Sequence, residues 1–472
     1  MQIPRMALLL SLTLGVSLSF GLGRVSAADF KPGELIVKYK SGAIRTRAQV
    51  NALYQTVGVK SANHFSGVMT GFDHWILDEG VKLQDAIHEV SQSELVEYAQ
   101  PNYVLHVLPI EDESEDPDFT PALAALGKCW FPGVSFPPGC EKKSATQPKP
   151  GELADSRPAL QEPPLEVIPS LKDPDLSRDY GMAKIRANEA WAVTRGSKEI
   201  VVADIDTGID YNHEDLAFNV WRNPNPGEKN DIVGFDFVHN DGLPYDDNGH
   251  GTHTAGTIGA VGGNGIGTSG VIQRVSIMSL KFLDGDGSGT TADAIRAIDY
   301  AIEHGARVLS NSWGGRGDPD NPALKEAIDR VKAKDVLFVA AAGNDGVDND
   351  GPNASYPAAF TTENLISVAA TDERDGLASF SNYGKKTTHL AAPGVKIYST
   401  APGSRYKSLS GTSMACPHVA GAAALLWSIH PNWGYQKIKE VLLGTVDPVS
   451  SLARKTITGG RLNVGRALNY SE

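Results

Sequence analysis

Residues 200–210 read IVVADIDTGID, and this stretch decides the fold. Its first six residues are mostly apolar, which is typical of a strand buried on both faces of a sheet. Similar runs recur at 275–280, 308–311, 336–340 and 365–369. Stretches that favour helices are found at 251–258, 291–304, 322–334 and 413–430. Apolar strands alternating with helices predict an α/β fold, with a mostly parallel, doubly wound sheet between two layers of helices.

The chain before this α/β domain changes composition twice. Residues 28–108 predict a small α+β domain, and residues 109–172 predict an extended linker, because their many prolines disfavour helices and sheet ladders. The α/β domain then occupies residues 173–472. Within the small domain we expect a strand at 34–39, helices at 49–57 and 83–91, and a closing pair of strands at 96–104.

The N-terminus predicts export. Arg5 precedes an apolar run over residues 6–22, and the small residues VSA at 25–27 form a cleavage site. We therefore expect residues 1–27 to be a signal peptide and the mature protein to be secreted. The alternative is an uncleaved membrane anchor, but the run is short for a span and is interrupted by Gly15 and Gly21. No later segment is apolar enough to span a membrane, so none is expected to anchor the mature form.

Charge and cysteine content narrow the possible partners. The formal net charge of −13 argues against a nucleic-acid partner, because phosphate binding requires a basic face. The three cysteines are too few for a disulfide scaffold. An exported chain permits a bridge between Cys129 and Cys140, which the sequence leaves open, and Cys416 would then remain unpaired.

Polar residues follow the buried strands where a catalytic site would form. Asp206 ends the strand at 200–205, and the carboxyl ends of parallel strands are where α/β proteins place their sites. His250, in NGHGTHTAG (248–256), and Ser413, in SGTSMACPH (410–418), each open a helix. A serine nucleophile needs a base, and the base needs an orienting carboxylate. Asn344, in AAAGN (340–344), follows another strand and supplies an oxyanion donor at the same edge.

These motifs, in the order Asp, His, Ser, resemble the three signatures of the subtilisin family. The resemblance implies a serine endopeptidase that acts through an acyl-enzyme, with Asp206, His250 and Ser413 as its triad and Asn344 in its oxyanion hole. Residues 31–106 resemble, more weakly, the family's inhibitory propeptide. A zymogen is therefore expected, in which the propeptide is an intramolecular inhibitor and the first cut falls near residues 107–111. Its other partners would be protein or peptide substrates, and we expect a monomer.

The resemblance also implies how a peptide substrate is held. Two backbone segments would pair with an extended substrate, and two others would wall the primary specificity pocket. No carboxylate is expected to line this pocket, so an apolar or broad preference is predicted. The implied substrate-binding residues are Gly287, Ser288, Gly289, Ser312, Trp313, Gly314, Ala341, Gly343 and Ser355.

Structural calcium is a further implication of the resemblance. Ca²⁺ prefers several oxygen ligands from carboxylates and carbonyls. The first implied site comprises Asp173, Asp215, Val261, Asn264, Ile266 and Thr268, in a loop that is one residue longer than the usual family pattern. A second site would use Asp236 and Asp241, although His239 stands where that pattern has an acidic residue.

Three alternative functions fit these residues less well. An inactive subtilisin-like binding or chaperone protein would more often lack a triad member. A protease selective for pairs of basic residues would need acidic residues in its pocket and usually an added β domain. A zinc peptidase would need two histidines four positions apart with a glutamate between them, whereas HGTH (250–253) spaces them three apart.

Overall fold

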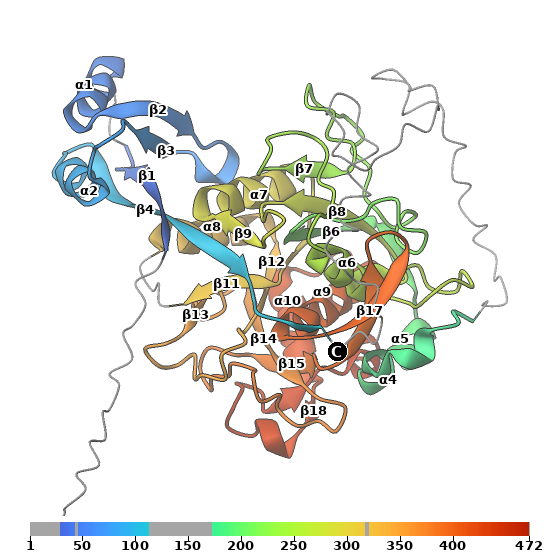
Figure 1. Ribbon diagram of the computed structural model, residues 1–472. Coiled ribbons are helices and arrows are strands. Elements are labelled where there is room, and N and C mark those ends of the chain that lie inside the picture. The colour runs from blue at the N-terminus through green and yellow to red at the C-terminus, as the bar shows by residue number, and fades with distance from the viewer. Residues whose placement is uncertain (1–28, 43–45, 113–171, 317–320, 472) are drawn as a thin grey trace, which may run out of the picture.

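The computed structural model describes residues 29–42, 46–112, 172–316 and 321–471 (Figure 1). The predicted signal peptide, most of the predicted linker, and both Cys129 and Cys140 lie outside the described residues. Within the part that is described, no helix is both long and apolar enough to cross a bilayer.

A nine-stranded sheet forms the centre of the larger domain. Its neighbouring strands are parallel, apart from β18 with β19. In spatial order the strands are β18 (Asp447–Pro448), β19 (Gly460–Arg461), β15 (Leu390–Pro393), β14 (Leu365–Thr371), β12 (Leu337–Ala341), β10 (Val308–Asn311), β6 (Gly196–Asp206), β8 (Arg274–Lys281) and β7 (Gly234–Asp236). The five predicted strands are β6, β8, β10, β12 and β14, with ends shifted by a few residues.

Helices cover both faces of this sheet, so the predicted three-layer α/β fold is confirmed (Figure 1). One face carries α6 (His250–Gly259), α9 (Thr412–Ile429) and α10 (Tyr435–Gly444), and the other carries α7 (Thr291–Glu303) and α8 (Pro322–Val331). Successive strand residues serve opposite layers, since Val202 packs in the core with α9 and Ala203 in the core with α7. The almost wholly apolar α9 is buried along nearly its full length, which places its first turn inside the domain.

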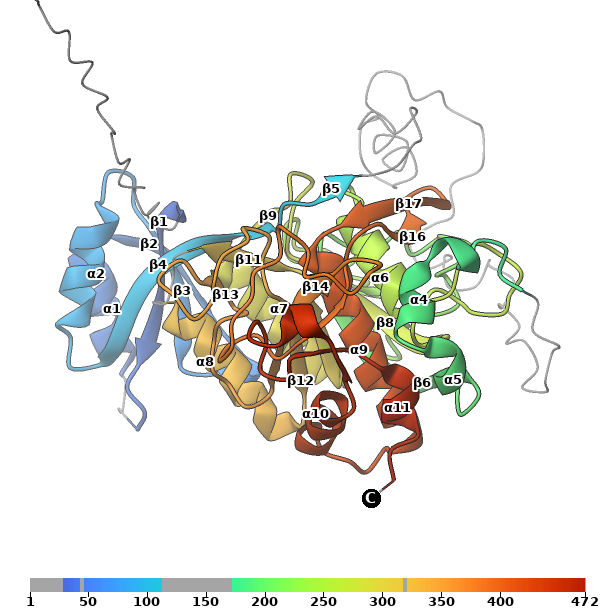
Figure 2. The ribbon, with the colours of Figure 1, turned by 90° about the horizontal axis from the view of Figure 1, so that it is seen from below.

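The smaller domain packs against α7 and α8, with its own helices on its outer face (Figure 2). Two of its side chains cap first-turn amides of the larger domain. Gln100 Oε1 accepts from the Ala323 N–H of α8, and Asn102 Oδ1 accepts from the Ala292 N–H of α7, each at 3.0 Å. Its elements are β1 (Phe30–Tyr39), α1 (Arg47–Val57), β2 (Val59–His64), β3 (Phe72–Leu77), α2 (Leu83–Ser91) and β4 (Val96–Val107).

One expectation about the smaller domain was wrong. Residues 96–104 do not form a pair of strands, because β4 is a single strand that continues to Val107. Its first part pairs with β1, where Pro101 lies opposite Leu35 without interrupting the strand. Its last part leaves β1 and pairs with β9 (Ser288–Thr290) and β11 (Trp313–Arg316) of the larger domain. The strand thus connects the two domains through continuous sheet pairing.

Shorter elements complete the described part of the chain. Residues 111–112, placed in the predicted linker, instead form β5 (Glu111–Asp112) and pair with β17 (Arg405–Ser410). The remaining elements are β13 (Ser355–Tyr356), β16 (Ile397–Ala401), α4 (Tyr180–Lys184), α5 (Ala187–Trp191), α11 (Val464–Leu468) and the 3₁₀ turns η1 (Gly67–Met69), η5 (Leu176–Arg178), η6 (Lys332–Lys334) and η7 (Ser450–Leu452).

Candidate active site

The fold positions the three predicted triad residues on three adjoining elements. Asp206 is the last residue of β6, His250 is the first residue of α6, and Ser413 is the second residue of α9. All three side chains are buried. Asp206 Oδ1 lies 2.7 Å from His250 Nδ1, which leaves Nε2 of the imidazole as the atom that can exchange a proton.

The serine hydroxyl does not face the histidine in this structure. Ser413 Oγ donates to the Ser312 carbonyl at 3.1 Å. His250 Nε2 and Asp206 Oδ2 are buried and have no hydrogen-bond partner among the described residues. A hydrogen bond from Ser413 to His250 therefore requires the hydroxyl to turn away from Ser312.

Asn344 is oriented by a residue that the sequence did not single out. The Thr412 N–H and the Thr412 hydroxyl both donate to Asn344 Oδ1, at 2.8 and 2.7 Å. The amide nitrogen is therefore directed toward the chain that follows β4, and Nδ2 donates to the Pro109 carbonyl at 2.6 Å. Thr412 stands inside the quoted serine motif, but its role depends on an approach of two loops that sequence does not reveal.

Asp246 is the second residue that sequence reasoning missed. Its Oδ1 accepts from Thr207 Oγ1 and from the N–H groups of Asn248 and Gly249, and its Oδ2 accepts from the N–H and hydroxyl of Thr252. The carboxylate thus ties the loop after β6 to the start of α6, where His250 lies. An aspartate shortly before a helix is a known capping signal, and it could have drawn attention to this position.

Two further buried groups near Asp206 also escaped the sequence analysis. Lys281 is almost fully buried and donates to the carbonyls of Thr207 and Leu283 and to Asp247 Oδ1. Asp204 lies two residues before Asp206 on the same face of β6, and burial, reinforced by Asp206, holds the pKa of its carboxyl well above its usual range.

The predicted substrate-binding segments surround the end of β4. Leu105 lies opposite Gly289 in β9, and Val107 lies opposite Trp313 in β11. The Val107 N–H donates to the Gly287 carbonyl at 2.8 Å. Ser288 lies at the open side, where its hydroxyl is 3.0 Å from His106 Nδ1.

The predicted pocket walls lie beside Leu108. A Cβ on Gly314 would lie 3.5 Å from Leu108 Cδ2 and 3.1 Å from Ser355 Oγ. Gly343 adjoins Ser355, and Ala341 belongs to the same core as Leu108. Ser312 accepts from the Ser413 hydroxyl, as described above. Trp313 contributes backbone to this region, because its indole packs against Phe282 in the core below.

The first predicted calcium loop encloses two carboxylates. Asp173 accepts from the N–H groups of Gly263 and Gly265, and Asp215 accepts from the Asn264 amide, the Thr268 N–H and the Tyr406 hydroxyl. Burial raises the pKa of Asp215 to about 7, and the charge of Asp173 adds to this shift. No hydrogen bond from a described residue ends on the carbonyls of Val261, Ile266 or Thr268. Buried, mutually repelling carboxylates next to free carbonyls suit a divalent cation.

At the second predicted site the carboxylate already has partners. Asp236 Oδ1 accepts from the N–H groups of Val238 and His239, and its Oδ2 lies 2.8 Å from His239 Nδ1. Asp241 pairs with Asp236 through backbone hydrogen bonds and accepts from the Leu243 N–H. A cation here would have to displace His239 from Asp236.

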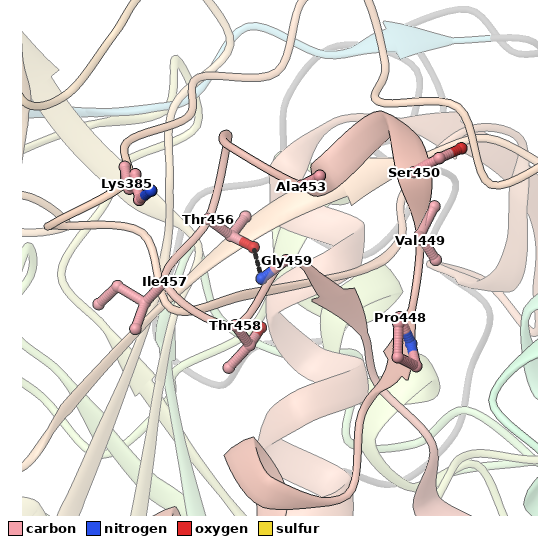
Figure 3. A pocket seen from close by; sticks show the side chains of 9 residues that line it. All are labelled: Lys385, Pro448, Val449, Ser450, Ala453, Thr456, Ile457, Thr458 and Gly459. Atoms are coloured by element: carbon pink, nitrogen blue, oxygen red, sulfur yellow. Dashed lines mark hydrogen bonds between the residues drawn. The ribbon is translucent and has the colours of Figure 1, made fainter.

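A surface hollow lies elsewhere, in the loops around β18 and β19 (Figure 3). Its rim includes Lys385, Pro448 and Ile457, and Thr456 Oγ1 accepts from the Gly459 N–H inside it. Its lining includes none of Asp206, His250 and Ser413 and no residue of β4, so we place the candidate active site at the carboxyl end of β6 and not at this hollow.

Comparison with known proteins identifies the family of each domain. The model of the subtilase family matches residues 197–463, and that of the fervidolysin N-terminal prodomain matches residues 21–102. Thermitase of Thermoactinomyces vulgaris is 42% identical over 294 residues, which cover 62% of this chain and 97% of thermitase. A thermophilic serine proteinase of Bacillus sp. (strain AK1) is 42% identical over 62% of this chain and 67% of its own length. Subtilisin DY of Bacillus licheniformis is 38% identical over 56% of this chain and 90% of its own length.

The matched regions correspond to the two described domains. The smaller domain is a prodomain, and the larger domain contains the buried pair of Asp206 and His250 next to Ser413. The fold, the prodomain and the relatives are those of a serine endopeptidase made with a propeptide. This chain belongs to the subtilase family.

Proposed function

We propose that this protein is a secreted serine endopeptidase in which Ser413 attacks the peptide carbonyl, His250 carries the proton and Asp206 orients the imidazole. The proton taken from the Ser413 hydroxyl passes through His250 Nε2 to the leaving amine, and water then hydrolyses the acyl-enzyme. Asn344 Nδ2 and the Ser413 N–H, one of the first-turn amides that no helix carbonyl accepts, stabilise the oxyanion.

The observation that carries this proposal is the 2.7 Å contact between Asp206 and His250 at the end of β6, beside the buried first turn of α9. A carboxylate on Nδ1 holds the imidazole with Nε2 free to act as the base. The alternative of an inactive binding protein is not favoured, because all three side chains and the oxyanion donor are present at one edge of the sheet.

The precursor would be secreted and would process itself. The end of β4 lies between the two substrate-binding segments, as an inhibitor does, and this supports a prodomain that blocks its own protease. The apolar N-terminal run supports export.

A fluorophosphonate probe tests the proposed nucleophile. The purified protein is first cut between residues 113 and 171 by an added cysteine protease, which is then inactivated, and is diluted so that the prodomain can dissociate. It is incubated with unfolded casein, with and without the probe, and the labelled residue is located by peptide mass mapping. We expect casein hydrolysis, its loss after labelling, and the label on Ser413. A folded protein that hydrolyses nothing and takes up no label would leave the inactive binding protein as the better function.

We further propose that Ca²⁺ stabilises the larger domain at the loop of residues 261–268. Asp173 and Asp215 would supply carboxylates, and Val261, Ile266 and Thr268 would supply carbonyls. Asn264 would contribute its amide oxygen after the amide turns, because its nitrogen now faces Asp215. Among the residues that the structure describes, no three His, Cys, Asp or Glu side chains gather around one point, so a cation here would depend on backbone oxygens.

Removal of calcium should lower the melting temperature. At pH 8 we compare protein in Ca²⁺ at about 100 times the Kd with protein in a chelator. We expect the calcium-loaded protein to have a free energy of unfolding that is roughly 2.7 kcal/mol larger. Because burial raises the pKa of Asp215 to about 7, protons compete with the cation, and the calcium-dependent gain should shrink as the pH falls to 5.5. Calorimetry with Ca²⁺ and with a chelator measures the gain.

A matched pair of variants separates the two predicted sites. Asp215→Asn should abolish most of the calcium-dependent gain, whereas Asp241→Asn should remove only what the second site contributes. An Asp215→Asn protein that is stabilised by Ca²⁺ as strongly as wild type would contradict the first assignment.

A further inference from the structure

Residues 105–108 lie in the cleft as a bound peptide would. Leu105 is opposite Gly289, His106 is opposite Gly314, and the Val107 N–H bonds to the Gly287 carbonyl. The segment is therefore the middle strand between β9 and β11 (Figure 2). Backbone pairing on both edges fixes its register and with it the direction of each side chain.

Two leucines of this segment point into the protein. Leu105 is 4% exposed and shares a core with Phe282 and Trp313, and Leu108 is 6% exposed beside Gly314 and Ser355. His106 and Pro109 are exposed. Leu105 thus fills a second, apolar pocket, three residues before Leu108, which lies in the primary specificity pocket.

Residues 109–112 continue past Ser413 and stay in contact with the larger domain. Asn344 Nδ2 donates to the carbonyl of Pro109, one residue beyond Leu108. Ile110 Cγ2 would lie 3.2 Å from a Cβ on Gly411, directly before the catalytic helix. Glu111 and Asp112 then pair with Ser410 and Leu409 of β17. The segment is therefore held on both sides of the bond that follows Leu108.

That bond, between Leu108 and Pro109, is a poor substrate for this chemistry. Cleavage needs Ser413 Oγ to bond to the Leu108 carbonyl carbon, and His250 to deliver the serine proton to the Pro109 nitrogen as the C–N bond breaks. In proline the ring carbon Cδ takes the place of the amide hydrogen. The nitrogen has to become pyramidal to accept the proton on its lone pair, and the ring restricts this change and crowds the reacting atoms. The Ser413 hydroxyl meanwhile bonds to Ser312, and the oxyanion donor bonds to the wrong carbonyl.

We infer that Pro109 protects the bond after Leu108 from Ser413, so that residues 105–110 block the site without being cut. The inference rests on the proposed function, in which the end of β4 occupies the substrate-binding segments. The enzyme does not free itself by cutting after Leu108, so activation requires a cut at another bond.

Replacing the proline tests the inference in the full-length precursor. Pro109→Ala should convert the inhibitor into a substrate, and a new cut between residues 108 and 109 should be seen by intact-mass measurement. Wild type should remain whole at this bond over the same period. Ile110→Ala, which alters the next side chain but keeps the proline, is the matched control and should also remain whole there. The double variant Pro109→Ala, Ser413→Ala should stay uncut, because the cut depends on the protein's own serine.

Synthetic peptides test the same point without relying on the folding of a variant. The peptide of residues 104–112 (VLHVLPIED) should inhibit casein hydrolysis by wild-type enzyme, with active sites counted by the fluorophosphonate probe. Its Pro109→Ala version should be hydrolysed after the second leucine. Replacing Leu108 by aspartate in that version should slow hydrolysis by roughly 100-fold, because the pocket has to bury a charge.

The outcomes separate this inference from the proposed function. If casein is cut but Pro109→Ala creates no new site in precursor or peptide, the protective role of the proline is wrong. Wild-type cleavage at Leu108–Pro109, or at Pro109–Ile110, would overturn the inference as well, since the second result would place Pro109 in the primary pocket. If wild type, after its linker has been cut and the prodomain diluted away, neither cuts casein nor takes up the probe, the proposed function fails and the inference fails with it.

Discussion

Ser413→Ala should lower kcat on a peptide substrate by about 10⁶-fold, the loss known for the equivalent serine of subtilisin, a relative of this chain. The side chain is buried at the first turn of α9 and carries the only atom placed to bond to a substrate carbonyl in the proposed mechanism. Steady-state hydrolysis of a leucine-containing peptide measures the loss, and circular dichroism verifies that the variant is folded.

The double variant Ser413→Ala, His250→Ala is a sharper test of the proposed triad. Because the serine and histidine act on one proton, removing both should cost about as much as removing one. Losses that multiply would show that the two side chains act independently and would contradict the proposed triad. Residual hydrolysis above the rate in water is expected from the oxyanion donors and from substrate binding.

Asn344→Ala should lower kcat by about 10²–10³-fold with little change in KM, which again is the range known for subtilisin. The amide stabilises charge that develops only in the transition state, so its loss should not weaken ground-state binding. The same kinetic assay gives both constants. A rise in KM at unchanged kcat would assign Asn344 to substrate binding.

Thr412→Val makes a useful companion, because it removes the hydroxyl donor to Asn344 Oδ1 and leaves the backbone donor in place. It also removes the acceptor of the Gly343 N–H, which adjoins Asn344. A smaller loss of kcat, in the same direction, is expected if Thr412 acts by orienting the amide. Combined with Asn344→Ala, the threonine change should have almost no further effect.

The sequence indicated the residues of the candidate site better than their surroundings. Asp206, His250 and Ser413 stand out because each ends or begins an element whose periodicity is evident, and a parallel sheet brings such ends together. The partners of Asp246 and Thr412 come from different loops, so neither role has a local signature. The course of β4 was missed for a similar reason, since its last residues pair with strands about two hundred positions later in the chain. The direction of the Ser413 hydroxyl depends on which acceptor lies nearest, which no sequence pattern encodes.

The uninterrupted course of β4 from the prodomain sheet into the cleft affects how the inhibitor leaves. While the chain is intact, the blocking segment is tethered to the site it blocks, so its local concentration is fixed and does not fall on dilution. A cut beyond Asp112 ends that arrangement, and prodomain and protease become two molecules held only by noncovalent contacts. From then on the fraction of protease free of the prodomain depends on total protein concentration, and dilution favours release.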